Sequence, residues 1–287
     1  MDREDIRLAI RNIKNLPTLP AIVSRILEVA DEAGSSAREL ADIISHDQSV
    51  SAKVLNLANS AFYGFSRRIA TIPQAVVVLG FETVKSLALG VSVFQSLSQK
   101  VGRVSFDREQ FWMHSIGCAA ATKLVAKGVG LKDTGTPFVA GLLHDVGKVI
   151  LDTYFNAEYQ KVIEEMIDEG RSAVDVETDV LNIDHAEVGG WLAARWKFPD
   201  TLVAPITYHH NLLGAPGEHL NYVLMVHLAN VLTKKSGIGL RYELEMPEPS
   251  DMVERVIGLT PSKILAVVGE LKAERDHIQE FFRYLNT

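Results

Sequence analysis

The sequence predicts an all-α fold, and three observations carry this prediction. Apolar residues recur at spacings of three and four along most of the 287 residues, which is the period of an amphipathic helix. Capping residues and prolines stand where these segments begin, and glycines stand where they end. No stretch alternates apolar and polar residues as a half-buried strand does, and no internal repeat of fixed period is evident. A multi-helix bundle is therefore expected.

The N-terminal third is expected to hold several helices. Gly34 is expected to end the first, and Ser36 with Glu39 forms a capping box at the start of the second. Asp47 is a good N-cap for the next helix, and Pro73 suits the first turn of the one that follows. The last of them carries apolar residues on nearly every face, so it is expected to be buried. The expected helices cover residues 19–30, 36–44, 47–61, 74–79 and 81–97.

The rest of the chain is expected to be helical as well, after a connector at residues 100–107. Asp107 and Asp184 are expected N-caps, and Pro199 ends the helix that Asp184 begins. Residues 235–252 are rich in glycine, proline and acidic residues, which predicts a loop. The expected helices cover residues 107–127, 136–144, 156–170, 184–196, 202–210, 221–234, 251–257 and 261–285. These elements are expected to form an N-terminal helical subdomain (1–103), a histidine-bearing helical subdomain (104–235) and a C-terminal loop with helices (236–287).

The composition argues against several classes of function. The chain has 36 acidic and 29 basic residues and a formal charge of −7, so a chain-wide nucleic-acid-binding surface is not expected. Residues 1–5 carry charges of both signs without an apolar run, unlike a secretion signal. The longest apolar stretches, 75–79 and 87–94, are too short to span a bilayer. We therefore expect a cytoplasmic protein with no membrane partner, in which the single cysteine, Cys118, is a small core residue.

Histidine is the most informative residue type, and the pair His144-Asp145 is the first candidate site. It lies in the run Gly-Leu-Leu-His-Asp-Val-Gly-Lys, where a helix is expected to end at Gly147. An imidazole and a carboxylate side by side can bind one divalent cation. Lys148 lies one turn from His144, so its ammonium could face an anion bound at the metal. Taken alone, the pair is explained better as a helix-end histidine followed by a turn aspartate.

Other histidines strengthen the metal interpretation. Phe-Trp-Met-His ends in His114, Asp-His-Ala-Glu-Val-Gly contains His185, and Tyr-His-His ends in His209 and His210. This order of His, His-Asp, His and His-His resembles the ligand order of the HD phosphohydrolase superfamily. The resemblance implies a fold that brings these helices around one or two metal ions. The superfamily's last ligand is an aspartate in a context like Leu-Ala-Asp, whereas His-Leu-Ala-Asn places Asn230 at that position here.

The N-terminal block narrows the resemblance to the HDOD family, a branch of the HD superfamily found in bacterial signalling proteins. Leu-Pro-Thr-Leu-Pro at 16–20, the run from Ile44 to Gly64, and Ile-Pro-Gln-Ala, Leu-Gly and Val-Lys between Ile72 and Lys85 are similar to that family's motifs. The similarity covers roughly residues 10–235. Many HDOD members have lost the metal ligands and act as regulatory modules, and this sequence departs from them by keeping the ligands.

The sequence also departs from the relatives that hydrolyse cyclic di-GMP. Those relatives carry Gly-Tyr-Pro soon after the double histidine, whereas His210 is followed here by Asn-Leu-Leu-Gly-Ala-Pro-Gly. The resemblance nevertheless implies a divalent transition metal, as one or two ions, with iron, manganese, zinc and nickel all suited to these ligands. The expected metal ligands are His114, His144, Asp145, His185, His209, His210 and Asn230.

Some details of this site stay open at the level of sequence. Neighbours on a helix point about 100° apart, so His209 and His210 are not expected to reach one ion together. Each could serve a different ion, or one could bind an anion or support a ligand. Asn230 offers a neutral amide oxygen, and His227 is expected to be a packed or surface residue rather than a substitute ligand. The alternative to a metal is a set of buried, hydrogen-bonded polar residues.

Three functions are open to such a chain. The first is an HDOD-type regulatory module with a structural or sensory metal and a protein signalling partner. The second is a metal-dependent phosphohydrolase acting on a nucleotide or other phosphoester, in which Asp145 and Lys148 are the expected catalytic residues and metal-bound water is the nucleophile. The third is a helix-turn-helix DNA-binding protein over residues 41–61. Nucleic acid binding is disfavoured because the recognition helix would carry one cation, Lys53.

Overall fold

The structure is a computed structural model that describes Ile6, Leu8 and residues 20–31, 36–65, 67–98, 104–238 and 248–286. Within these residues every regular element is a helix and no strand occurs, which confirms the all-α prediction. Some of the predictions concern residues that the structure does not describe. These are the motif at 16–19, the helix end at Gly34, and parts of the connector and of the C-terminal loop.

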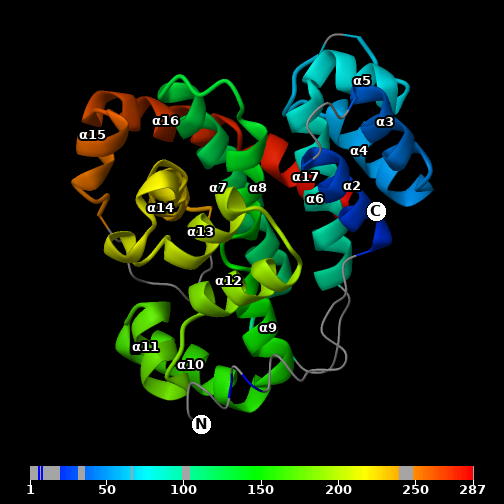
Figure 1. The fold of residues 1–287 in the computed structure, drawn as a ribbon. Coiled ribbons are helices and arrows are strands. Elements are labelled where there is room, and N and C mark those ends of the chain that lie inside the picture. The colour runs from blue at the N-terminus through cyan, green and yellow to red at the C-terminus, as the bar shows by residue number, and fades with distance from the viewer. Residues whose placement is uncertain are drawn as a thin grey trace.

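The N-terminal block forms because short polar caps start each of its helices. The hydroxyl of Ser36 accepts the Glu39 N–H at 3.2 Å, and the Glu39 carboxylate accepts the Ser36 N–H at 2.9 Å. This is the expected capping box. Asp47 accepts the Val50 N–H at 3.0 Å in the same way. The block consists of α2 (Ala21–Asp31), α3 (Ala37–Ser45), α4 (Gln48–Ala58), α5 (Ile72–Leu79) and α6 (Phe81–Leu97) (Figure 1).

The second block is built around a long central helix, α7, which packs against α8, α14, α16 and α17. Small buried residues such as Gly117 and Ala121 line α7 and let its neighbours approach closely. Two helices were not expected, α9 and α11, and both prove important for the site. The helices are α7 (Arg108–Gly128), α8 (Gly135–Leu143), α9 (Val146–Tyr154), α10 (Asn156–Glu169), α11 (Ala173–Leu181), α12 (His185–Arg195), α13 (Asp200–Tyr208) and α14 (Leu220–Lys235), with 3₁₀ turns η1 (Leu212–Gly214) and η2 (Gly217–His219).

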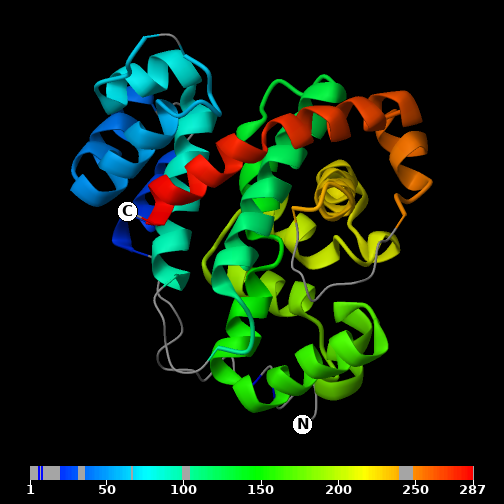
Figure 2. The same cartoon turned by 180° about the vertical axis from the view of Figure 1, so that it is seen from behind.

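The C-terminal helices are α15 (Met252–Ile257), α16 (Pro261–Ala273) and α17 (Arg275–Asn286). The prediction of a single helix over 261–285 is therefore wrong, because a turn at Glu274 separates α16 from α17. Figure 2 shows α16 and α17, in orange and red, running across α7 toward the N-terminal block. The pairing of α17 with α4, α6 and α7 agrees with this view.

Three aromatic rings join the two blocks to the C-terminal helix. Phe62 follows α4, Phe138 lies in α8, and Phe281 lies in α17. Their ring centroids lie 5.6–5.8 Å apart in every pairing, which is a favourable separation for aromatic contacts. One apolar core accordingly contains residues of helices from α2 to α17, and a second core joins α7, α14, α15 and α16. Among the described helices, none combines the length and the apolarity needed to cross a bilayer.

The helix that would recognise DNA in the disfavoured DNA-binding alternative is α4, and its contacts also argue against that role. The Nζ atom of Lys53 donates to the carbonyl of Leu285 at 2.6 Å, so the helix's one cation is bound to α17. Burial lowers the pKa of Lys53. Without further cations on α4, contacts to several phosphates are not available.

Candidate metal centre

Five histidines and one aspartate from separate helices meet between α7, α9, α12 and α13. His114 lies in α7, His144 and Asp145 form the turn between α8 and α9, and His185 is the first residue of α12. His209 and His210 directly follow α13. All these side chains are buried except His210, which is exposed. The structure thus brings together every expected histidine ligand with Asp145.

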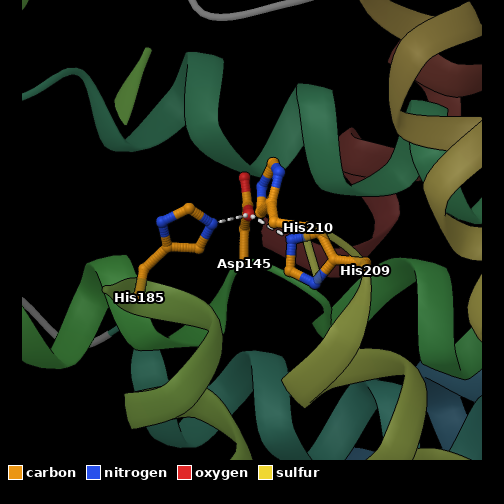
Figure 3. Close-up of side chains that lie close together, drawn as sticks. All are labelled: Asp145, His185, His209 and His210. Atoms are coloured by element: carbon orange, nitrogen blue, oxygen red, sulfur yellow. Dashed lines mark ion pairs between the residues drawn. The ribbon is translucent and has the colours of Figure 1, made fainter. Parts of the chain in front are cut away.

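The carboxylate of Asp145 lies at the centre of this cluster. Its Oδ1 atom is 3.0 Å from Nε2 of His185, 3.4 Å from Nε2 of His144 and 3.6 Å from Nε2 of His209. Its Oδ2 atom is 3.8 Å from Nε2 of His114. Figure 3 shows the Asp145 carboxylate between the rings of His185 and His209. Four imidazoles therefore direct the same nitrogen, Nε2, toward one carboxylate.

Two overlapping groups of candidate ligands share Asp145. One contains His114, His144 and Asp145, and the other contains Asp145 with the three remaining histidines. Within each group the ligand atoms lie within 4.8 Å of one another. Ligand-to-metal distances of about 2 Å place two ligand atoms at most about 4 Å apart, so any pair near the 4.8 Å limit has to close by less than about 1 Å when a cation binds.

The backbone selects the tautomer of these histidines. His144 and His209 each follow a helix, and the Nδ1 atom of each donates to the carbonyl three residues earlier. His144 bonds Gly141 at 2.8 Å, and His209 bonds Ile206 at 2.9 Å. A carbonyl oxygen can only accept, so Nδ1 carries the proton and, in the neutral ring, Nε2 presents a lone pair. This is the arrangement found around histidine ligands of metal ions.

Burial keeps the rings of His144 and His209 neutral. Burial lowers the pKa of His144 well below its usual value and lowers that of His209, although Asp145 opposes the shift in each case. Their Nε2 atoms are buried and make no hydrogen bond with the described residues. Two nitrogen lone pairs directed at a carboxylate oxygen repel it, and buried polar atoms without partners cost free energy. A divalent cation resolves both problems, so the residues fit a metal.

The fourth buried imidazole, His185, is held by a carboxylate that sequence reasoning missed. Oε2 of Glu177, in α11, accepts Nδ1–H of His185 at 2.6 Å and the backbone N–H of His185 at 2.8 Å. Its Oε1 accepts the hydroxyl of Tyr159 at 3.0 Å. Glu177 is fully buried and satisfied on both oxygens. Its signal in the sequence was an acidic residue on the apolar side of a short helix whose N-cap is Ser172.

Glu177 also changes the charge on His185. Burial lowers the pKa of His185, but the Glu177 and Asp145 carboxylates outweigh burial and raise that pKa to about 10. Without a metal, the ring therefore keeps a proton on each nitrogen at neutral pH. Binding of a cation between His185 and Asp145 requires the loss of the proton on Nε2.

Lys148 lies inside the cluster rather than at its edge. Its Nζ atom is 2.8 Å from Oδ2 of Asp145, and the side chain is only 2% exposed. Burial acts to raise the pKa of Asp145, but the positive charges of Lys148 and His185 outweigh burial and hold that pKa well below its usual range. Asp145 is therefore ionised in the folded protein.

The expectation that Gly147 ends a helix is wrong, because it is the second residue of α9. A Cβ atom at this position would lie 1.9 Å from the carbonyl oxygen of His185 and 2.8 Å from the amide nitrogen of Gly189. Glycine is needed because the backbones of α9 and α12 touch here. This contact sets Asp145 beside His185.

His209 and His210 also depart from expectation. The helix α13 ends at Tyr208, so the rule of about 100° between helical neighbours does not apply to them. Their ring centroids are 4.2 Å apart, and both belong to one candidate ligand group. His227 is half-buried and its Nδ1 donates to the His209 carbonyl at 2.9 Å, as a packing residue would. Asn230 is buried in α14, and its Oδ1 has no hydrogen-bond partner among the described residues.

Comparisons with known proteins agree with this architecture. The family model for the HDOD domain matches residues 16–212. A solved HDOD domain protein of unknown function from Geobacter sulfurreducens is 28% identical, with a TM-score of 0.78 over 98% of this chain and 95% of that chain. A candidate phosphohydrolase from Shewanella amazonensis has a TM-score of 0.75 at 24% identity, over 98% of this chain and 97% of that one. At this identity the likeness concerns the fold.

Two further relatives are longer than this chain. A candidate signal transduction protein from Marinobacter aquaeolei has a TM-score of 0.81 at 23% identity, and the alignment covers 99% of this chain and 66% of that one. An uncharacterised protein of Treponema pallidum is 27% identical over 229 residues, which are 78% of this chain. The match spans 44% of the length of that Treponema protein.

Proposed function

The chain belongs to the HDOD family, and from this premise we propose that it is a signal-transduction module built around a divalent transition-metal centre. One observation carries the proposal. Buried imidazoles from different helices donate through Nδ1 to fixed acceptors and direct Nε2 at the ionised carboxylate of Asp145. A regulatory domain that had lost its metal would have no reason to keep this tautomer pattern in its core.

We assign the ligands in two groups that meet at Asp145. His114 and His144 form one group with it, and His185, His209 and His210 form the other. Asn230 supplies an amide oxygen from α14. These two groups are best suited to two ions that share Asp145 as a ligand. Imidazole and carboxylate ligands suit iron, manganese, zinc or nickel.

The burial of the ligands favours a sensory or structural metal over an open catalytic one. His114, His144, Asp145, His185 and His209 are all 0% exposed. A catalytic site keeps an open position for water and substrate. In this cluster only His210 is exposed, and Asn230 replaces the acidic ligand that the superfamily uses. The proposed output is a change in the relative positions of helices that reaches a protein partner.

A metal-dependent phosphohydrolase is the second candidate, and Lys148 is the observation that favours it. When bound, the metal lowers the pKa of water and polarises phosphoryl oxygens. Lys148 holds an ammonium beside Asp145, where it can bind a phosphate oxygen. Asp145 accepts hydrogen bonds and can orient a water molecule. His210 is the exposed residue of the cluster, and an anionic nucleotide or another phosphoester would enter beside it.

Metal analysis of the purified chain, followed by activity assays, separates these functions. We expect at least one equivalent of transition metal, and much less in His144→Ala. His46→Ala is the matched control, because its Nδ1 also donates to a backbone carbonyl, of Asp42, but at an exposed position outside the cluster. Hydrolysis of a nucleotide or phosphoester that is lost in His144→Ala would establish the enzyme. Stoichiometric metal without turnover would support the signalling module, and the absence of binding to any of the four metals would overturn both.

A further inference from the structure

The turn that ends α14 holds a backbone carbonyl beside the metal centre. Gly237 follows the helix in the left-handed conformation (φ +70°), and its N–H donates to the Lys234 carbonyl at 2.9 Å. The N–H of Ile238 donates to the Thr233 carbonyl at 3.1 Å. These two bonds define a Schellman motif, which fixes the direction of the chain as it leaves the helix. The position of Ile238 is therefore set by the end of α14.

Ile238 contacts the metal centre through both its backbone and its side chain. Its carbonyl accepts from Nδ1 of His114 at 3.2 Å. Its side chain is 6% exposed and lies over Gly117, one turn after His114 in α7. A Cβ atom at Gly117 would come within 2.7 Å of Cγ2 of Ile238. The absence of a side chain at Gly117 thus makes the space that Ile238 fills, and this packing sets the carbonyl against His114.

The guanidinium group of Arg275, in α17, hydrogen-bonds to the same turn. Nη2 of Arg275 donates to the carbonyl of Ser236 at 3.0 Å and to the carbonyl of Gly237 at 3.2 Å. These carbonyls stand at the negative end of the α14 dipole, where a cation is stabilising. Arg275 therefore links α17 to the two residues directly before Ile238.

We propose that Arg275 is a positioning residue for His114, acting through the turn at 236–238. Loosening this turn lets the Ile238 carbonyl move away from His114, and the ring then loses part of its fixed tautomer and direction. Metal affinity falls as a result, because support from an outer partner raises the basicity of a ligand and fixes its orientation. The inference rests on the proposed metal centre, and it makes α17 part of that centre although the helix lies beyond the HDOD match.

The test compares Arg275→Gln with Arg283→Gln. Both arginines lie in α17 and line the same open cleft between α7 and α17, and both substitutions remove one positive charge. Arg283 is exposed and lies two turns further along the helix. We expect the dissociation constant for zinc, measured by competition with a chelator, to rise about threefold to tenfold in Arg275→Gln. This range lies at and below the lower end of the roughly 10–100-fold effects seen for direct outer partners. Arg283→Gln is expected to stay within about twofold of the unmodified chain.

Two further readouts distinguish positioning from a general loss of stability. Nitrogen NMR of the metal-free protein is expected to show a smaller population of the Nδ1–H tautomer at His114 in Arg275→Gln, with the other ligand rings unchanged. Arg275→Lys retains a donor and a charge and is expected to recover most of the zinc affinity. Equal zinc affinities in the two glutamine variants, or an unchanged His114 tautomer, would overturn this inference. A chain that binds no zinc before any substitution would instead refute the proposed metal centre itself.

Discussion

A single carboxylate oxygen, Oε2 of Glu177, accepts both the backbone N–H and the ring Nδ1–H of His185. The shared acceptor satisfies the first backbone N–H of α12, whose N-cap is Asp184, and it sets how the first side chain of that helix is oriented. Glu177 thus combines the role of a helix cap with that of the carboxylate partner of a histidine ligand. The start of α12 and the geometry of the proposed metal ligand depend on the same oxygen atom.

We predict that Glu177→Gln weakens metal binding about 10- to 100-fold, the usual effect of removing an outer partner of a ligand. The amide keeps the size of the side chain but loses the negative charge, so the pKa of His185 in the metal-free protein falls from about 10. Isothermal titration with zinc and NMR titration of the histidine ring measure these two effects. Asp175→Asn is the control, because Asp175 lies exposed on the same helix. An unchanged zinc affinity in Glu177→Gln would show that this carboxylate does not support the ligand.

Metal affinity is predicted to increase with pH up to about 10. With its pKa raised to about 10, His185 is protonated at neutral pH, and the cation must displace the proton from Nε2. Each pH unit below the pKa of a group that must lose one proton weakens binding by up to about tenfold. Calorimetry in buffers with different ionisation enthalpies should show close to one proton released near pH 7.5 for each ion bound in the group that contains His185. Affinity that stays constant between pH 6 and 9 would contradict a protonated His185.

The raised pKa of His185 also makes the stability of the metal-free fold depend on pH, and this dependence is opposite in sign to that of metal affinity. The folded pKa of His185 lies above its unfolded value of 6.5, so its stabilising contribution is complete below about pH 6.5. It is lost as the pH rises toward 10. The metal-free chain is therefore predicted to lose this contribution over the range in which metal binding strengthens. Urea unfolding at several pH values, with and without chelator, measures the free energy of unfolding of the two forms. The difference between the metal-loaded and the metal-free form is expected to grow as the pH rises.

Lys148→Met is predicted to destabilise the metal-free protein more than the metal-loaded one. The ammonium of Lys148 is buried against Asp145, and breaking a buried ion pair by removing one partner costs about 3–5 kcal/mol. A bound cation supplies positive charge to the same carboxylate, so the cost is expected to be smaller in its presence. The free energy of unfolding of both forms, compared with the unmodified chain, gives the two values. Equal losses in the two forms would place the metal away from Asp145.

Lys123 provides a pH-dependent contribution at the junction of the two blocks. Its Nζ lies 4.3 Å from the ring centroids of Phe62 and Tyr63, and burial, assisted by Lys127 and opposed by Glu274, lowers its pKa to about 8. The unfolded value is 10.5, so the unfolded chain binds the proton more tightly between pH 8 and 10.5, and this group adds stability as the pH rises through that range.

Lys123→Met is therefore predicted to remove this rising contribution, so that the stability of the metal-free protein falls more steeply with pH between pH 8 and 10.5 than in the unmodified chain. Chemical unfolding at half-unit intervals of pH, in the presence of chelator, measures the slope for each variant. Lys127→Met is the control, since Lys127 is exposed one turn further along α7. If the rising contribution to stability remained in Lys123→Met and disappeared in Lys127→Met, the titrating group would be Lys127, and the prediction for Lys123 would be wrong.

Features that depend on neighbouring residues in the chain were predictable from the sequence. Ser36, Asp47 and Asp184 each start a helix as expected, because capping is a bond between residues two or three positions apart. The histidine ligands and Asp145 were found through motifs whose order along the chain is distinctive. The convergence of those residues was implied by resemblance, and the structure brings them together.

The features that were missed depend on contacts between distant segments. Gly147 was interpreted as a helix stop, because local rules cannot show that the backbone of α12 touches it. Glu177 was missed because its partner lies on another helix, and a buried acid resembles a surface acid in sequence. Ile238 acts through its carbonyl, which no side-chain pattern reveals. The partners of metal ligands are in this respect harder to predict than the ligands.

The bond from Lys53 to the carbonyl of Leu285 joins residues that are 232 positions apart. The residues around Lys53 emerge from the ribosome long before Leu285 is synthesised, because translation adds only about 5–20 residues per second. The helices around α4 are therefore exposed for tens of seconds without the helix that covers them. Contacts of such long separation also slow spontaneous refolding, since a long loop must close before they form. The helices around α4 are therefore among the last described elements to reach their final packing, although they are synthesised well before α17.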